Sequence, residues 1–265
     1  MDPFEAHKAK QKLGWAHFAP LEAVTTPAAA QLVRRADIRP GQRVLDVGCG
    51  TGVVAITAAL RGAKVTGLDL TPELLERARE NARTAEVSVE WHEGDAESLP
   101  FPDGAFDVVL SQFGHIFAPR ADVALSEMLR VLAPGGTIAF NTWPPELFVG
   151  ASFALVARYA PPPPAGASPP PQWGDPSVVR QRFGDAVTDL VFDRRTMYVP
   201  ALSPQHFRES NERLVGPMKG LAASLGESDP EKLAAFRAEF EALASRYFVD
   251  NQVVQGYLIT RATKR

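Results

Sequence analysis

A glycine-rich segment near position 50 has the residue types and spacing of a ligand-binding loop. It reads Asp46-Val47-Gly48-Cys49-Gly50-Thr51-Gly52. The loop joins an apolar run, residues 43–47, to a run of small apolar residues with helical character, residues 53–61. Glycines in such a place let the backbone approach a ligand closely, and they leave the first N–H groups of the helix free for an anionic group. We therefore predict a ligand site at this loop, with a tight turn that binds nothing as the alternative.

The spacing of the glycines separates two classes of ligand. A dinucleotide fingerprint, G-x-G-x-x-G, requires its third glycine at position 53, which is Val53, whereas this loop has Gly52. Asp46 also stands directly before the loop. A carboxylate there is unfavourable beside a pyrophosphate but suits an amino group, so the pattern favours a ligand that carries one.

Two further acidic residues follow later strands. Asp69 comes 19 positions after Gly50, close to the offset of about 20 residues at which an acid meets ribose hydroxyls. Asp95 follows the next predicted strand, where its carboxylate can accept a hydrogen bond from an adenine amino group. Either acid alone is also typical of a loop cap. Together with Asp46 they predict an adenosyl amino acid at one edge of the sheet.

Residues that follow the predicted strand 106–110 are candidates for chemistry on a second molecule. Among the histidines, only His115 is predicted at this edge of the sheet, and its unperturbed pKa suits proton abstraction near neutral pH. A contact with a ligand and ordinary packing are the alternative roles. The remaining histidines show no spacing typical of a metal site, so we expect no metal.

Aromatic residues from two regions are predicted around the same edge. Phe113, Phe117 and Trp143 form the walls of an apolar substrate pocket in this interpretation, or else pack in the core. Trp15 and Phe18 precede the first predicted helix and either close over the ligand or fix the N-terminus to the body.

The elements that must position these residues alternate between strands and helices. This alternation predicts an α/β fold with a mostly parallel sheet. The predicted strands are residues 43–47, 64–68, 87–91, 106–110, 137–141, 187–199 and 253–260. Thr26 and Pro27 are expected as the N-cap and first-turn proline of a helix that reaches Arg35. Two helices, 203–226 and 229–248, are predicted before the last strand.

The chain is predicted to form a single domain, residues 1–265. Its parts are an N-terminal helical region (1–39), a ligand-binding core (40–142), a proline-rich connector (161–176) and a helical cap insertion (203–248). Half of the residues in the connector are proline, which excludes a regular helix or a central strand there.

Composition and charge exclude several classes of protein. The formal net charge of −3 argues against a nucleic-acid surface and against a polybasic membrane patch. The single cysteine, Cys49, excludes an intramolecular disulfide and a multi-cysteine metal site, and it is expected to fill space rather than act as a nucleophile. No apolar run is long enough to cross a bilayer. We expect a cytoplasmic monomer or homodimer that binds neither nucleic acid nor membranes.

Five motifs in the same order resemble the class I S-adenosylmethionine (SAM)-dependent methyltransferases, in particular the group related to quinone-biosynthesis methyltransferases. The motifs are Val44-Leu45-Asp46-Val47-Gly48-Cys49-Gly50-Thr51-Gly52, Gly67-Leu68-Asp69, Gly94-Asp95-Ala96, Phe106-Asp107-Val108-Val109-Leu110-Ser111 and Arg130-Val131-Leu132-Ala133-Pro134-Gly135-Gly136. They cover about residues 40–142. The resemblance implies a doubly wound, Rossmann-like sheet of seven strands with an antiparallel last strand.

The resemblance also implies a role for each matching residue. Asp46 and the loop residues Gly48, Cys49, Gly50 and Gly52 would hold the methionine end of SAM. Asp69 would hold the ribose hydroxyls, Leu70 would pack on adenine, and Asp95 with the Ala96 backbone would bind the adenine edge. Ser111 would lie beside the sulfonium and amino group, and Gln112 is a further candidate for cofactor binding. The region of Trp15 and Phe18 folds over the cofactor in similar proteins.

The function expected from these features is transfer of a methyl group from SAM to a small, partly apolar metabolite by direct displacement. His115 is the candidate general base for that reaction. Three alternatives stay open: a SAM-binding regulator or accessory subunit without catalysis, an aminopropyl transferase that uses decarboxylated SAM, and an NAD-dependent oxidoreductase.

Overall fold

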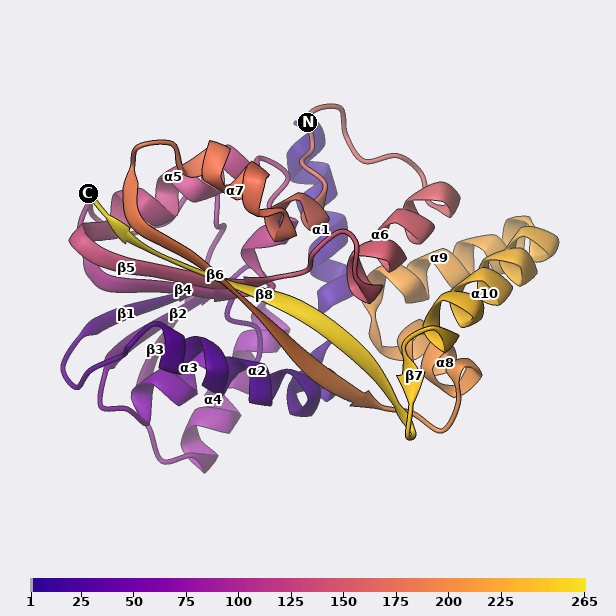
Figure 1. The fold of residues 1–265 in the computed structure, drawn as a ribbon, viewed down its shortest axis with the longest axis horizontal. Helices are drawn as coiled ribbons and strands as arrows, with labels where there is room; N and C mark the ends of the chain where they lie inside the picture. The colour runs from indigo at the N-terminus through magenta and orange to yellow at the C-terminus, as the bar shows by residue number, and fades with distance from the viewer. Residues whose placement is uncertain (1) are drawn as a thin grey trace.

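The computed structural model describes residues 2–265, which contain one twisted sheet with helices on both faces (Figure 1). Along the sheet the strands lie in the order β3-β2-β1-β4-β5-β8-β6, and the short β7 pairs with β8. Their bounds are β1 (Arg43–Val47), β2 (Lys64–Asp69), β3 (Val89–Glu93), β4 (Phe106–Gln112), β5 (Leu132–Thr142), β6 (Val187–Pro200), β7 (Phe248–Val249) and β8 (Gln252–Lys264).

The direction of the strands confirms the predicted fold class. Strands β1 to β5 pair in parallel, whereas β8 is antiparallel to both of its long neighbours, β5 and β6. The strand order reverses between β2-β1 and β1-β4, and the crevice beyond the carboxyl ends of strands at such a point is where open α/β sheets bind ligands. The glycine loop follows β1 and therefore lies at this crevice.

Helices cover the two faces of the sheet because the central strands are apolar on both sides. Val44, Leu45 and Val47 of β1 are fully buried, as expected for a parallel strand between two helical layers. One face is covered by α2 (Glu22–Arg35), α3 (Val53–Ala59) and α4 (Pro72–Thr84), and the other by α5 (Ala121–Val131) and α7 (Pro176–Phe183) (Figure 1).

A second group of helices lies beyond the carboxyl ends of the parallel strands. It consists of α6 (Phe148–Tyr159), α8 (Pro204–Leu214), α9 (Gly216–Ser228) and α10 (Pro230–Ser245). The long strands β6 and β8 extend past the rest of the sheet to reach this group, which we call the cap (Figure 1). The cap has its own apolar cluster, in which the Phe148 ring lies 5.6 Å from Phe207 and 6.1 Å from Phe240.

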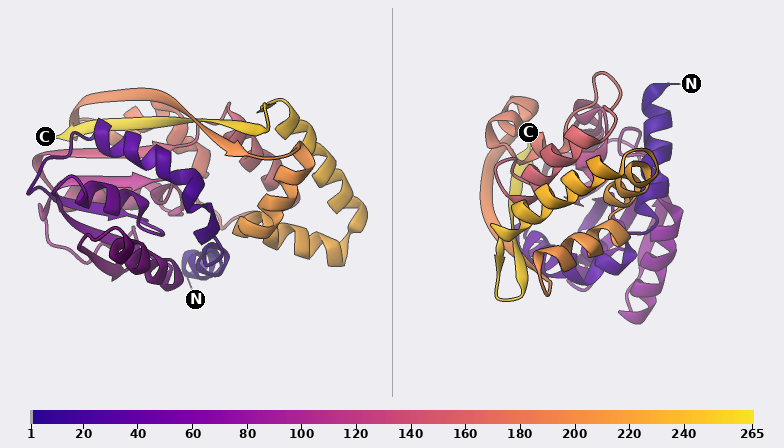
Figure 2. Two further views of the ribbon diagram at one scale, coloured as in Figure 1. Left: turned by 90° about the horizontal axis from the view of Figure 1, so that it is seen from below. Right: turned by 90° about the vertical axis from the view of Figure 1, so that its right-hand side faces the viewer.

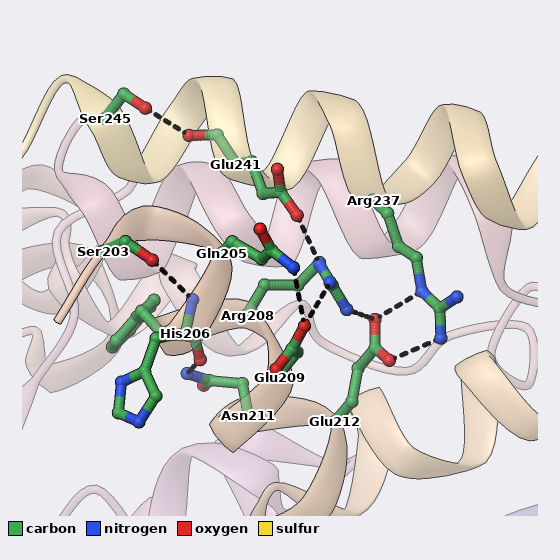
Figure 3. A network of polar contacts seen from close by, with 11 residues as sticks. Ser203, Gln205, His206, Arg208, Glu209, Asn211, Glu212, Arg237, Glu241 and Ser245 are labelled. Atoms are coloured by element: carbon green, nitrogen blue, oxygen red, sulfur yellow. Dashed lines mark hydrogen bonds and ion pairs between the residues drawn. The ribbon is translucent and has the colours of Figure 1, made fainter. Parts of the chain in front are cut away.

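Charged side chains join two of the cap helices (Figure 3). Arg208 on α8 is only 7% exposed, and its guanidinium contacts Glu241 of α10 at 2.6 Å and Glu212 at 2.9 Å. Arg237 of α10 also contacts Glu212, at 2.7 Å. A buried arginine requires such partners, because an unpaired buried charge is strongly destabilising.

The N-terminal helix α1 (Pro3–Trp15) lies at the boundary between the sheet and the cap (Figure 2). It approaches α9 closely at Gly14 and Gly216: a Cβ atom added to Gly216 would lie 2.4 Å from the Gly14 carbonyl oxygen. The absence of side chains at this crossing allows the two helices to touch through their backbones.

Several predicted boundaries were wrong. α2 begins at Glu22 rather than at Thr26, and Pro27 lies inside the helix, where the Thr26 hydroxyl donates to the Glu22 carbonyl at 2.7 Å. The predicted helix 203–226 is two helices, α8 and α9. Pro217 explains the break, because it has no N–H group to continue the helix and its ring clashes with the preceding turn.

The proline-rich segment contains more structure than its composition indicates. Residues 161–169 form no helix or strand, but the 3-10 helix η3 (Pro170–Gly174) follows them and Trp173 is fully buried. This part of the chain is thus anchored in the core by one aromatic side chain. Among residues 2–265, no helix combines the length and the apolar character needed to cross a bilayer.

Candidate active site

A cavity of about 320 Å³ lies between the carboxyl ends of the parallel strands, α1 and the cap. Its residues come from parts of the chain that are distant in sequence, from Lys8 on α1 to Gln255 on β8. One end is formed by the glycine loop and the ends of β2 and β3, and we call it the polar end. The other end is formed by α6, α8, α9 and the aromatic residues after β4 and β5, and we call it the apolar end.

The three glycines of the loop are required for different reasons. All three have positive φ angles, +65° for Gly48, +54° for Gly50 and +83° for Gly52. A Cβ atom on Gly48 would lie 2.8 Å from the Gly114 Cα atom, and one on Gly52 would lie 2.6 Å from the Trp91 ring. At Gly50 no atom lies within 4 Å of that position. Gly50 is therefore the glycine that leaves room for a ligand, whereas Gly52 serves packing and does not line the cavity.

Asp46 provides an unpaired acceptor at the polar end. Its Oδ2 atom accepts a hydrogen bond from the Ala55 N–H at 3.0 Å, but Oδ1 is buried and has no partner among residues 2–265. Burial raises the pKa of this carboxyl group to about 8. A ligand ammonium group would satisfy Oδ1 and favour the ionised carboxylate, so the residue fits the amino acid end of SAM.

Asp69 is bonded directly to the glycine loop. Its Oδ2 atom accepts from the Gly50 N–H and its Oδ1 atom from the Thr71 N–H, each at 2.8 Å. Asp69 and Gly50, which are 19 residues apart in the sequence, are therefore in direct contact. Burial raises the pKa of Asp69, although these backbone hydrogen bonds act in the opposite direction. A carboxylate has about four acceptor positions, so two stay available for ligand hydroxyls.

Asp95 at the polar end is held by a residue that the sequence did not point to. The Lys8 ammonium of α1 lies 2.6 Å from Asp95 Oδ2 and 3.3 Å from Glu97. Burial alone would lower the pKa of Lys8, but its hydrogen bonds to Asp95 and Glu5 raise that pKa above its ordinary value. Lys12 lies four residues further along α1 and contacts Glu93 at 2.5 Å. Residues four apart on a helix lie on the same face. The spacing of Lys8 and Lys12 could therefore have indicated a helix that presents two lysines to acidic residues.

Aromatic residues close the cavity beside α1. Trp15 packs 4.5 Å from the Phe117 ring and 5.6 Å from the Phe18 ring, measured between centroids. All three side chains line the cavity, as do the predicted site residues Cys49, Leu70, Ala96 and Gln112. These contacts place Trp15 beside Phe117, while the contact of Lys8 with Asp95 places α1 beside the polar end.

Besides Gly52, two predicted site residues lie outside the cavity. Ser111 is completely buried, and its hydroxyl donates to the Val47 carbonyl at 2.6 Å. The structure also places His115 away from the cavity, with its ring between Phe140 at 4.6 Å and Trp173 at 4.7 Å. Neither ring nitrogen of His115 has a hydrogen-bond partner among the described residues.

The surroundings of His115 are unfavourable for a general base. It is 1% exposed, and burial, followed by the charge of Arg182, lowers its pKa to about 3. The ring points away because Gly114 packs against the backbone of Gly48, so the following turn directs the side chain toward η3. His115 has the position of a core residue.

The apolar end is built around a stacked aromatic pair. The rings of Phe113 and Trp143 are nearly parallel, with 3.9 Å between their centroids and 9° between their planes. Phe113 has a φ angle of +59°, which is uncommon for an aromatic residue and costs free energy. Its N–H donates to the Asn141 carbonyl at 3.1 Å and helps to hold this conformation.

Ionisable side chains line only the polar end of the cavity. Within the part of the chain that the structure describes, they are Lys8, Asp46, Cys49, Asp69 and Asp95. The apolar end has aliphatic and aromatic side chains with a few neutral amides and hydroxyls. It therefore provides no residue that can remove a proton near neutral pH.

Comparisons with known proteins agree with this geometry. Residues 44–136 match a family model described as a methyltransferase domain. An uncharacterized protein of Mycobacterium tuberculosis is 38% identical over 263 residues, which cover 99% of this chain and 95% of that protein. The demethylmenaquinone methyltransferase of Thermus thermophilus is 43% identical over 119 residues, which cover 44% of this chain and 53% of that enzyme.

Solved structures share the fold. The YcgJ protein of Bacillus subtilis has a TM-score of 0.63 at 20% identity, and the match covers 89% of this chain and 97% of that one. A structure described as a putative methyltransferase of Bacillus halodurans has a TM-score of 0.61 at 21% identity, covering 89% and 98% of the two chains.

Proposed function

Because this chain belongs to the class I SAM-dependent methyltransferases and is related to the quinone-biosynthesis group, we propose that it methylates a small, partly apolar metabolite. SAM is the methyl donor of this family. The proposal rests on the lining of the cavity, in which a polar end that fits SAM continues into an apolar end without ionisable side chains.

At the polar end, each proposed contact to SAM rests on an available group. The free Oδ1 atom of Asp46 would bind the amino group, and the open space at Gly50 would admit the methionine end. Asp69 would use its remaining acceptor positions for the ribose hydroxyls. Leu70 and the segment around Asp95 line the same end and would surround the adenine.

Bound SAM supplies an electrophilic methyl group on its sulfonium. In the proposed displacement, the acceptor's lone pair forms the new bond to the methyl carbon, while the carbon–sulfur bond breaks and its electron pair stays on sulfur. The protein's share of this reaction is to orient the acceptor in line with that bond and to exclude water. The aromatic pair Phe113 and Trp143, together with Phe117, would do this at the apolar end.

The absence of an ionisable residue at the apolar end of the described chain bears on the acceptor. No side chain there removes a proton, so we propose that the acceptor enters with its proton already lost to solvent or reacts as a nucleophile that needs no base. The cap helices α8 and α9 would shield it from bulk water, since Phe207 and Met218 line the cavity.

The test is formation of S-adenosylhomocysteine when the full chain is incubated with SAM and a panel of neutral, largely apolar metabolites. Turnover of one or more of them supports the proposal. Calorimetry with SAM and with NAD runs in parallel: tight SAM binding without turnover of any acceptor would favour a SAM-binding regulator. Binding of NAD alone would contradict the proposal.

A further inference from the structure

The apolar end of the cavity contains an amide side chain that has no partner. Gln255 on β8 is only 9% exposed and lines the cavity, yet its side chain makes no hydrogen bond to any residue between 2 and 265. Its amide nitrogen and oxygen are open to the cavity rather than enclosed by protein. Its donor and its acceptor are therefore available to a molecule that enters the cavity.

The register of the sheet fixes where Gln255 stands. It pairs with Met197 of β6, which also lines the cavity. Side chains two residues apart in a strand share a face, so Gln255 lies between Tyr257 and Val253. Tyr257 packs 5.9 Å from the Phe113 ring, and Val253 belongs to the apolar cluster of the cap. Gln255 is thus placed at the junction of the aromatic pair and the cap.

The other side-chain amides of the cavity are already engaged within the described chain. Gln11 donates to the Phe117 carbonyl at 3.2 Å, and Gln112 donates to the Thr25 carbonyl at 3.0 Å. Asn211 donates to the Phe207 carbonyl at 2.8 Å. These bonds hold the walls of the cavity, whereas Gln255 has both its donor and its acceptor available.

We propose that Gln255 is the specificity-determining residue of the acceptor site and that it hydrogen-bonds to a neutral oxygen, a hydroxyl or a carbonyl, on an otherwise apolar ring compound. This inference rests on the proposed function and names its substrate class. An amide pairs with a neutral oxygen through one donor and one acceptor. A carboxylate or phosphate at the same place would be buried without a counter-ion and would be excluded.

The test measures binding of 2-naphthol and naphthalene to the full chain saturated with S-adenosylhomocysteine. Naphthalene has the same ring system without the hydroxyl. One net hydrogen bond at this site is expected to give 2-naphthol a preference of about tenfold in the wild-type chain. Gln255→Met keeps the side-chain length but removes the amide. In this variant the two compounds should bind with about equal affinity, while naphthalene binding stays the same or tightens.

Gln252→Met is the matched control, because Gln252 belongs to the same strand, faces the opposite side and does not line the cavity. It should keep the wild-type preference. An equal preference in the wild type and in Gln255→Met would overturn the inference, and so would failure of both probes to bind to a chain that binds S-adenosylhomocysteine. Failure to bind S-adenosylhomocysteine at all would instead contradict the proposed function.

Discussion

Binding of SAM is expected to expel a proton from Asp46. The carboxyl group is buried, and burial raises its pKa to about 8. At about pH 6.5 a group with this pKa is protonated in nearly every molecule, whereas an amino group in solution still carries its charge. An ammonium group beside Oδ1 favours the carboxylate, so roughly one proton should leave for each SAM that binds.

Calorimetry in two buffers that differ in ionisation enthalpy measures this proton directly, because the apparent binding enthalpy changes in proportion to the protons released. We expect a slope of roughly one proton per SAM for the wild-type chain at about pH 6.5. Asp46→Asn should reduce the slope to near zero and weaken binding by about 1.5–3 kcal/mol, the range of a hydrogen bond to a charged group. The exposed Asp185→Asn is the control and should match the wild type. Tight binding with a zero slope in the wild type would refute the pairing of Asp46 with the amino group.

Three further experiments test the glycine loop, Asp69 and His115. Gly50→Ala and Gly41→Ala introduce the same methyl group at positive φ where no atom lies within 4 Å, so both should lose similar stability. Only the former faces the cavity, and calorimetry should show SAM affinity falling by about 1–3 kcal/mol in that variant alone. Asp69→Ala should weaken SAM binding by about 1–3 kcal/mol, since the ribose hydroxyls lose a charged acceptor; unchanged affinity would remove its assigned role. His115 has a pKa lowered to about 3 from 6.5, so its folded state binds fewer protons than the unfolded chain and wild-type stability should decline as pH falls through that interval. Denaturation of His115→Phe should show a smaller decline, and turnover per folded molecule should persist; loss of turnover would return His115 to the reaction.

The polar end could be predicted because its chemistry is local in the sequence. The loop around Gly50 and the acid Asp69 lie at the carboxyl ends of neighbouring strands, so strand order alone brings them together, and their contact at 2.8 Å follows. The antiparallel β8 was also predicted. The loop and the acid depend on residue spacing, which an amino-acid sequence displays directly, whereas the direction of β8 was implied by the resemblance to the methyltransferase family.

The apolar end could not be predicted in the same way. Its walls include Phe207 and Gln255, which reach the cavity only through the docking of the cap on the extended strands β6 and β8. No local pattern encodes that arrangement. The placement of His115 could not be predicted for a related reason, because the direction of its ring depends on the close contact between Gly114 and Gly48.

Two polar groups without partners among the described residues stand at opposite ends of the cavity. Asp46 has a buried oxygen without a partner at the polar end, and this lowers the stability of the ligand-free chain. At the apolar end, the Gln255 amide faces the cavity without a hydrogen bond to the described residues. Neighbouring polar groups such as Gln112 and Asn211 are satisfied internally, so the fold is able to satisfy amides at this site. The two exceptions differ in chemistry: a carboxylate for a charged amino group and an amide for a neutral oxygen. A ligand pair that satisfies both must place its charge near the glycine loop and its neutral oxygen near the cap. Such a pair is oriented along the cavity before any reaction occurs, which is the positioning that in-line displacement requires.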